Sequence, residues 1–144
     1  MRIIIFSVVF ILTVIVLGHS ATEITDPVFE QLKSELKKQG VSEQFIKITE
    51  NSVKRMILSQ AKIPDIKTVL LDLWNQGVKG RALKNAVAAV AELVESGDDT
   101  LEASRIASGA AHQAEAEGLS GFGVGMRVKK AVGDRKAYLK NIKQ

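Results

Sequence analysis

The sequence contains no cysteine in its 144 residues. Disulfide bonds, thiol nucleophiles and cysteine-ligated zinc are therefore excluded. A lipid-anchored lipoprotein is excluded as well, because no cysteine follows the apolar run near the N-terminus. An exported chain without disulfides is stabilised by packing alone, which fits a bacterial periplasm better than a small disulfide-stapled extracellular module.

Residue types suited to catalysis are also scarce. Only one of the two histidines, His112, lies beyond residue 20. Since a zinc site normally needs three or four ligands, usually His or Cys, we expect no metal site, no cofactor and an ordinary surface or half-buried His112. No serine has the flanking motif of a hydrolase triad. Asp98 with Asp99, and Glu115 with Glu117, are candidate carboxylate pairs, so a secreted hydrolase is one alternative function.

Long apolar runs are absent except at the start of the chain. Residues 3–17, IIIFSVVFILTVIVL, follow Arg2 and precede Gly18-His19-Ser20-Ala21. A charge, a short apolar run and then small residues form the layout of a secretory signal peptide. We predict a signal peptide over 1–20, cleaved after Ser20. An uncleaved membrane anchor is the alternative, although the run is shorter than the roughly 20 apolar residues that span a bilayer.

The remaining residues, 21–144, predict a single all-α domain of about six short helices. Apolar residues recur at helical spacing, and no stretch alternates as a strand would. We expect Asp26 to cap a helix that begins at Pro27, Ser42 to cap the next, and Asp99 with Glu102 to form a capping box. Glycines 40, 77, 97 and 118 are predicted helix ends. Short linkers indicate an antiparallel bundle or stacked helical hairpins.

Four glycines fall within eight residues in GLSGFGVGMRVKKAV, residues 118–132. A dinucleotide-binding loop would need a preceding strand and different spacing, and a P-loop would need Gly-Lys-Ser or Gly-Lys-Thr. The stretch instead matches GVKGRALKNAVAAVA, residues 77–91, with Gly77 over Gly118 and Gly80 over Gly121. We therefore predict a helix end, a turn and a new helix, and we treat 77–91 and 118–132 as a possible duplicated hairpin. Gly123 and Gly125 have no explanation in this pattern.

Acidic residues are nearly absent from the end of the chain. The C-terminal segment, 127–144, contains seven basic residues and one acid, Asp134: Arg127, Lys129, Lys130, Arg135, Lys136, Lys140 and Lys143. Its expected apolar stripe is Val124, Val128, Ala131, Tyr138, Leu139 and Ile142. A basic amphipathic helix of this kind is typical of attachment to an anionic surface, although a solvated basic face has the same pattern.

Aromatic residues make up only 5% of the sequence. With Phe122 and Tyr138 alone near the basic segment there is little capacity to stack on bases, and nucleic acid is not an expected partner of an exported chain. Trp74, the single tryptophan, is expected in the core. We predict an exported, non-catalytic binding or envelope-structural protein. Its partner is predicted to be a protein or an anionic envelope surface, namely lipid, lipopolysaccharide or a wall polymer.

Overall fold

A computed structural model describes residues 21–144, with side chains from Asp26 onward; the predicted signal peptide over 1–20 lies outside the described residues. The described part is all-helical, as predicted. It consists of α2 (Ala21–Lys38), α3 (Glu43–Leu58), α4 (Ile63–Asn75), α5 (Gly80–Glu95), α6 (Thr100–Ala116) and α7 (Gly121–Ile142).

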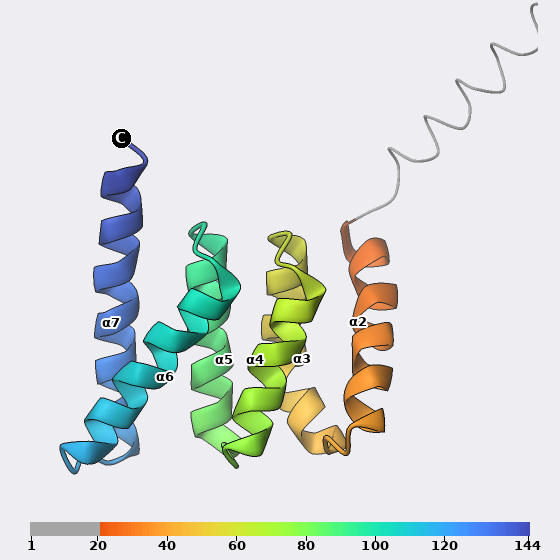
Figure 1. The fold of residues 1–144 in the computed structure, drawn as a ribbon, viewed down its shortest axis with the longest axis horizontal. Helices are drawn as coiled ribbons and strands as arrows, with labels where there is room; N and C mark the ends of the chain where they lie inside the picture. The colour runs from red at the N-terminus through yellow and green to blue at the C-terminus, as the bar shows by residue number, and fades with distance from the viewer. Residues whose placement is uncertain (1–20) are drawn as a thin grey trace, which may run out of the picture.

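The six helices form two layers. Figure 1 shows α2, α3, α5 and α7 side by side, with α4 and α6 crossing in front of them. Helices α3, α5 and α7 run in one direction, and α2, α4 and α6 run in the other (Figure 1). Helices α3, α5 and α7, and likewise α4 and α6, are therefore each one hairpin apart in the sequence, which is how stacked helical hairpins are arranged, while α2 packs beside its sequence neighbour α3.

One continuous core lies between the layers. Its largest fully buried side chains include Phe29 and Leu32 of α2, Phe45 of α3 and Leu70 of α4. Trp74 packs against this core as expected, edge-on to Phe45 with ring centroids 5.4 Å apart. Aromatic pairs of this geometry add to the stabilisation that comes from buried area.

The alanine-rich stripe of α6 faces inward. Ala103, Ala107 and Ala114 are buried, and Ala110 is partly buried against the core. Alanine favours the helical conformation, and its short side chain lets neighbouring helices approach, so α6 lies close to α4, α5 and α7.

Two predicted caps are confirmed and two details are wrong. Ser42 accepts a hydrogen bond from the Phe45 backbone N–H, and Asp99 accepts from the backbone N–H groups of residues 101 and 102. Asp26 does not begin a helix: α2 starts at Ala21 and continues through Pro27, and the Asp26 carboxylate instead pairs with Lys54 at 2.7 Å. The capping box is also incomplete, because the Asp98 carboxylate, rather than Glu102, accepts the Asp99 N–H.

The predicted apolar stripe of α7 is partly wrong. Val128 and Leu139 are buried, but Tyr138 is 53% exposed and Ile142 is 60% exposed, and Val132 is buried in their place. The reason is that, among the described residues, α7 makes its main contacts with α5 and α6, so a narrow strip of its surface is covered. Helix α7 therefore presents much of its circumference to solvent.

Candidate functional site

The seven basic residues of the C-terminal segment separate into two groups. Four of them bond to the neighbouring helices or to the turns that follow these helices: Arg127 to Glu117, Arg135 to Asp98, Lys136 to Glu92 and Lys143 to the Ser96 carbonyl. These four are called the inner cations below. The other three, Lys129, Lys130 and Lys140, are exposed and are called the outer lysines. The structure therefore does not bring all seven onto one free basic face.

Arg135 makes the most enclosed of the inner contacts. Its Nε and one terminal nitrogen each donate to Asp98 at 2.8 Å, and Glu102 lies 3.9 Å away. The Asp98 side chain is only 3% exposed. The hydrogen bonds to Asp98 raise the pKa of Arg135 above its ordinary value. This bidentate pair fixes α7 to the turn between α5 and α6.

Lys136 and Lys143 hold α7 against the end of α5. Lys136 donates to Glu92 at 2.9 Å, and Lys143 donates to the backbone carbonyl of Ser96 at 3.1 Å. The Lys143 ammonium lies where a side chain at Gly97 would be. A cation beside the last carbonyls of a helix is favoured by the helix dipole. A surface hollow lies beside these contacts, and its lining also includes Ala137, Leu139 and Lys140 of α7.

The outer face of α7 carries the remaining charges. It is defined by Phe122, Met126, Lys129, Gly133, Ala137 and Lys140, which recur at helical spacing and are all exposed, with Lys130 at its edge. Phe122 is 83% exposed and Met126 is 54% exposed. Lys130 has only the long contact to Asp134, at 3.7 Å, and neither Lys129 nor Lys140 pairs with an acid among residues 26–144.

The glycine-rich stretch is a helix start, as predicted. Helix α6 precedes it, Gly118 ends that helix with φ +77°, and α7 begins at Gly121. The structure also explains Gly123, which the sequence pattern did not, whereas the space around Gly125 is ordinary. A Cβ at position 123 would lie 3.1 Å from the Leu119 side chain, and at position 125 it would meet Asn85 of α5 at 3.8 Å. Gly123 gives room to the turn, and Gly125 lies at the contact with α5.

The candidate acids and His112 are placed separately. Asp98 is bonded to Arg135, and Asp99 caps α6. His112 and Glu115 lie 3.8 Å apart, with each side chain about two-thirds exposed. Glu117 pairs with Arg127. Within residues 26–144 no cluster of three or more histidine, aspartate or glutamate side chains has metal-binding geometry.

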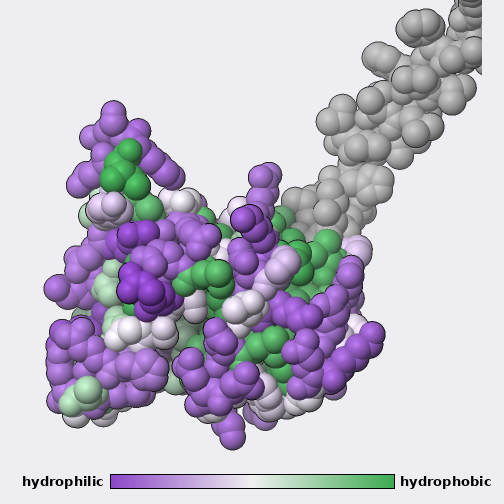
Figure 2. Space-filling view, in the orientation of Figure 1, coloured by the Kyte–Doolittle hydropathy of each residue, from purple (hydrophilic) through white to green (hydrophobic). Residues whose placement is uncertain are grey.

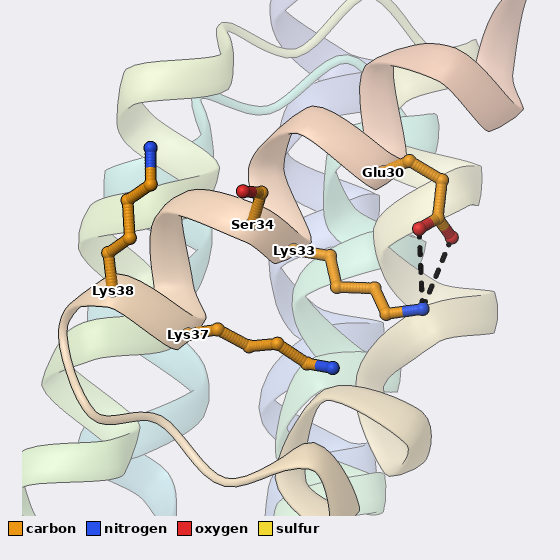
Figure 3. Close-up of a pocket in the computed structure, with 5 residues that line it drawn as sticks. All are labelled: Glu30, Lys33, Ser34, Lys37 and Lys38. Atoms are coloured by element: carbon orange, nitrogen blue, oxygen red, sulfur yellow. Dashed lines mark hydrogen bonds and ion pairs between the residues drawn. The ribbon is translucent and has the colours of Figure 1, made fainter.

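A second hollow lies on α2, at the opposite end of the layer. Figure 3 shows the residues that line it, namely Glu30, Lys33, Ser34, Lys37 and Lys38. Lys33 pairs with Glu30 at 3.3 Å, Lys37 pairs with Glu43 at 3.1 Å, and Lys38 points away from both. The side chains do not converge on a common point, and one carboxylate alone lines the hollow. This surface is thus a row of solvated ion pairs on a helix.

The rest of the visible surface is mainly hydrophilic. Figure 2 shows small, separate hydrophobic patches on the face that carries α4 and α6. In the part of the chain that the structure describes, no helix is both long enough and apolar enough to cross a membrane.

Comparison of the chain with protein-family models, curated proteins and solved structures finds no match. The outer face of α7, with its outer lysines and its exposed Phe122 and Met126, is the candidate site.

Proposed function

We propose that this chain is an exported, non-catalytic binding protein whose binding surface for an anionic ligand is the outer face of α7. The observation that carries the proposal is the division of the basic residues. Arg127, Arg135 and Lys136 already have acidic partners on α5, α6 or the adjoining turns, whereas Lys129 and Lys140 have none among the described residues. A cation without an intramolecular partner is available to an external anion.

Export is supported by the order of residues at the N-terminus, from Arg2 through the apolar run to Ser20. Expression in a bacterial host followed by cell fractionation tests it. We expect the protein outside the cytoplasm with Ala21 as its first residue, as determined by mass spectrometry of the intact protein. A cytoplasmic protein that retains residues 1–20 would contradict this part of the proposal.

Vesicle co-sedimentation tests the binding surface. Near an anionic membrane each basic residue contributes about 1 kcal/mol, so the triple variant K129Q/K130Q/K140Q is expected to lose most of its binding. The matched control is K38Q/K47Q/K79Q, which removes the same charge from exposed positions outside α7. We expect binding to anionic but not neutral vesicles, and we expect it to decrease as salt is raised. Equal losses in the two triple variants would mean that net charge, rather than α7, governs binding.

A further inference from the structure

Helices α3, α5 and α7 repeat one arrangement along a single layer. They start at Glu43, Gly80 and Gly121, run in the same direction and lie next to one another (Figure 1). Each contact in the layer is bridged by an ion pair between helices. Lys54 of α3 pairs with Asp26 of α2 at 2.7 Å, Arg55 of α3 with Glu95 of α5 at 2.6 Å, and Lys136 of α7 with Glu92 of α5 at 2.9 Å.

The surface of α5 that holds α7 has a counterpart on α7 itself. Asn85 of α5 lies beside Gly125 of α7, while Glu92 and the C-cap residue Ser96 accept hydrogen bonds from Lys136 and Lys143, respectively. Gly80 and Gly121, the first residues of α5 and α7, are 41 residues apart. The residues 41 positions after Asn85, Glu92 and Ser96 are Met126, Gly133 and Ala137. All three belong to the outer face. The outer face is therefore the position at which a further helix would extend the layer.

We propose that the outer face of α7 binds an acidic amphipathic α-helix of a protein partner, which packs as the next helix of the layer. This rests on the proposed function and specifies its ligand. Phe122 and Met126 provide exposed apolar anchors at one end, and Gly133 and Ala137 allow a helix to approach closely in the middle. The outer lysines would form ion pairs with this helix, as Lys54, Arg55 and Lys136 do between helices of the layer, so the partner helix carries carboxylates.

The length of the face sets the length of the partner. Phe122 and Lys140 are 18 positions apart, which corresponds to about 27 Å along the helix. A partner helix of about five turns would therefore reach both the apolar anchors and the farthest lysine.

A second copy of this chain does not supply the required charge. Its own α7 carries the same outer lysines, and its α2 end carries Lys33, Lys37 and Lys38 with Glu30. Packing α7 against α7 would bring the outer lysines together, which opposes association, and the acids at the α2 end, Glu30 and Glu43, are already paired with Lys33 and Lys37. The partner is therefore a different protein.

A pair of peptides tests the proposal on the protein purified after export. The first is a helical peptide of about 20 residues with leucine and alanine on one face and glutamate on both flanks; the second replaces every glutamate with lysine. We expect the acidic peptide to bind at least about tenfold more tightly in fluorescence anisotropy. K129Q/K130Q/K140Q should weaken that binding about tenfold, as should F122A/M126A, while K38Q/K47Q/K79Q should leave it unchanged.

Gly133→Gln separates helix docking from attachment to a lipid surface. A Cβ at Gly133 would meet no atom within 4 Å, so the variant folds and melts a few degrees higher because glutamine is the better helix former. We expect it to weaken the acidic peptide about tenfold by blocking close approach, and to leave vesicle binding unchanged. If it leaves peptide binding unchanged, the helix does not pack on this face and the inference is wrong.

The two peptides and the vesicles together distinguish the failures. If the acidic peptide binds no better than the basic one while anionic vesicles bind, the helical partner is refuted and the proposed function stands. If neither the peptide nor the vesicles bind, both are refuted. The protein purified after export is used for every variant, so all of the variants compared have the same N-terminus.

Discussion

The buried alanine residues of α6 allow this helix to pack closely against its neighbours, and this packing can be tested by a single substitution. Ala103 is 0% exposed and lies in the contact of α6 with its neighbouring helices. Replacing it with leucine adds three carbon atoms where no space is left, which costs about 1–3 kcal/mol through shifted side chains and backbone. For a folded part of this size we expect Ala103→Leu to lower the Tm by about 4–12 °C.

The matched control places the same side chain elsewhere on α6. A Cβ at Gly109 would meet no atom within 4 Å, and Gly109 is exposed. Because leucine is a better helix former than glycine by about 0.8 kcal/mol, Gly109→Leu should raise the Tm by about 3 °C. Thermal unfolding followed by circular dichroism measures both. Tm values for Ala103→Leu and the parent that agree within error would refute the close packing of α6.

Three further predictions use the same melting assay. The hydrogen bonds from Arg55 hold the pKa of Glu95 below its ordinary value of 4.5. As the pH drops through 4.5, the unfolded chain therefore takes up a proton before the folded chain does, and stability should fall. The fall should be less steep in E95Q, which cannot take up that proton. Gln60 adopts φ +62° just after α3. A left-handed backbone conformation costs a residue with a side chain about 1 kcal/mol, so Gln60→Gly should raise the Tm by a few degrees. Asp98→Asn removes the charged partner of Arg135 and should lower the Tm by several degrees, whereas Glu115→Gln, at an exposed site, should not.

Helix ends with a local cause could be predicted from the sequence. Glycines 40, 77, 97 and 118 were expected to end helices, and all four adopt positive φ between +71° and +89°. Serine at position 42 likewise provides its cap through its own side chain. The end of α3 had no such signal, because glutamine occupies the left-handed position there. The early start of α2 could not be read either, since Pro27 and Asp26 normally favour a helix that begins at the proline.

The candidate site was only partly predictable, because its acids come from other helices. Glu92 is 44 residues from Lys136, and Asp98 is 37 residues from Arg135. The spacing of basic residues along one helix carries no information about partners so far away in the sequence. The exposed apolar pair was also missed, although Phe122 and Met126 are four residues apart and Lys129 follows three residues later, which places all three on one helix face.

The position of α7 depends on its inner cations as well as on its apolar contacts. The helix has 22 residues, of which Val128, Val132 and Leu139 are the buried ones. Exposed ion pairs contribute little individually, but the enclosed Asp98–Arg135 pair and the Lys143 contact to Ser96 anchor α7 over its C-terminal half. Because these contacts use the flanks of α7 that face α5 and α6, they leave Lys129, Lys130 and Lys140 exposed to solvent. The same pairing that fixes the helix thus determines which charges are available to a partner.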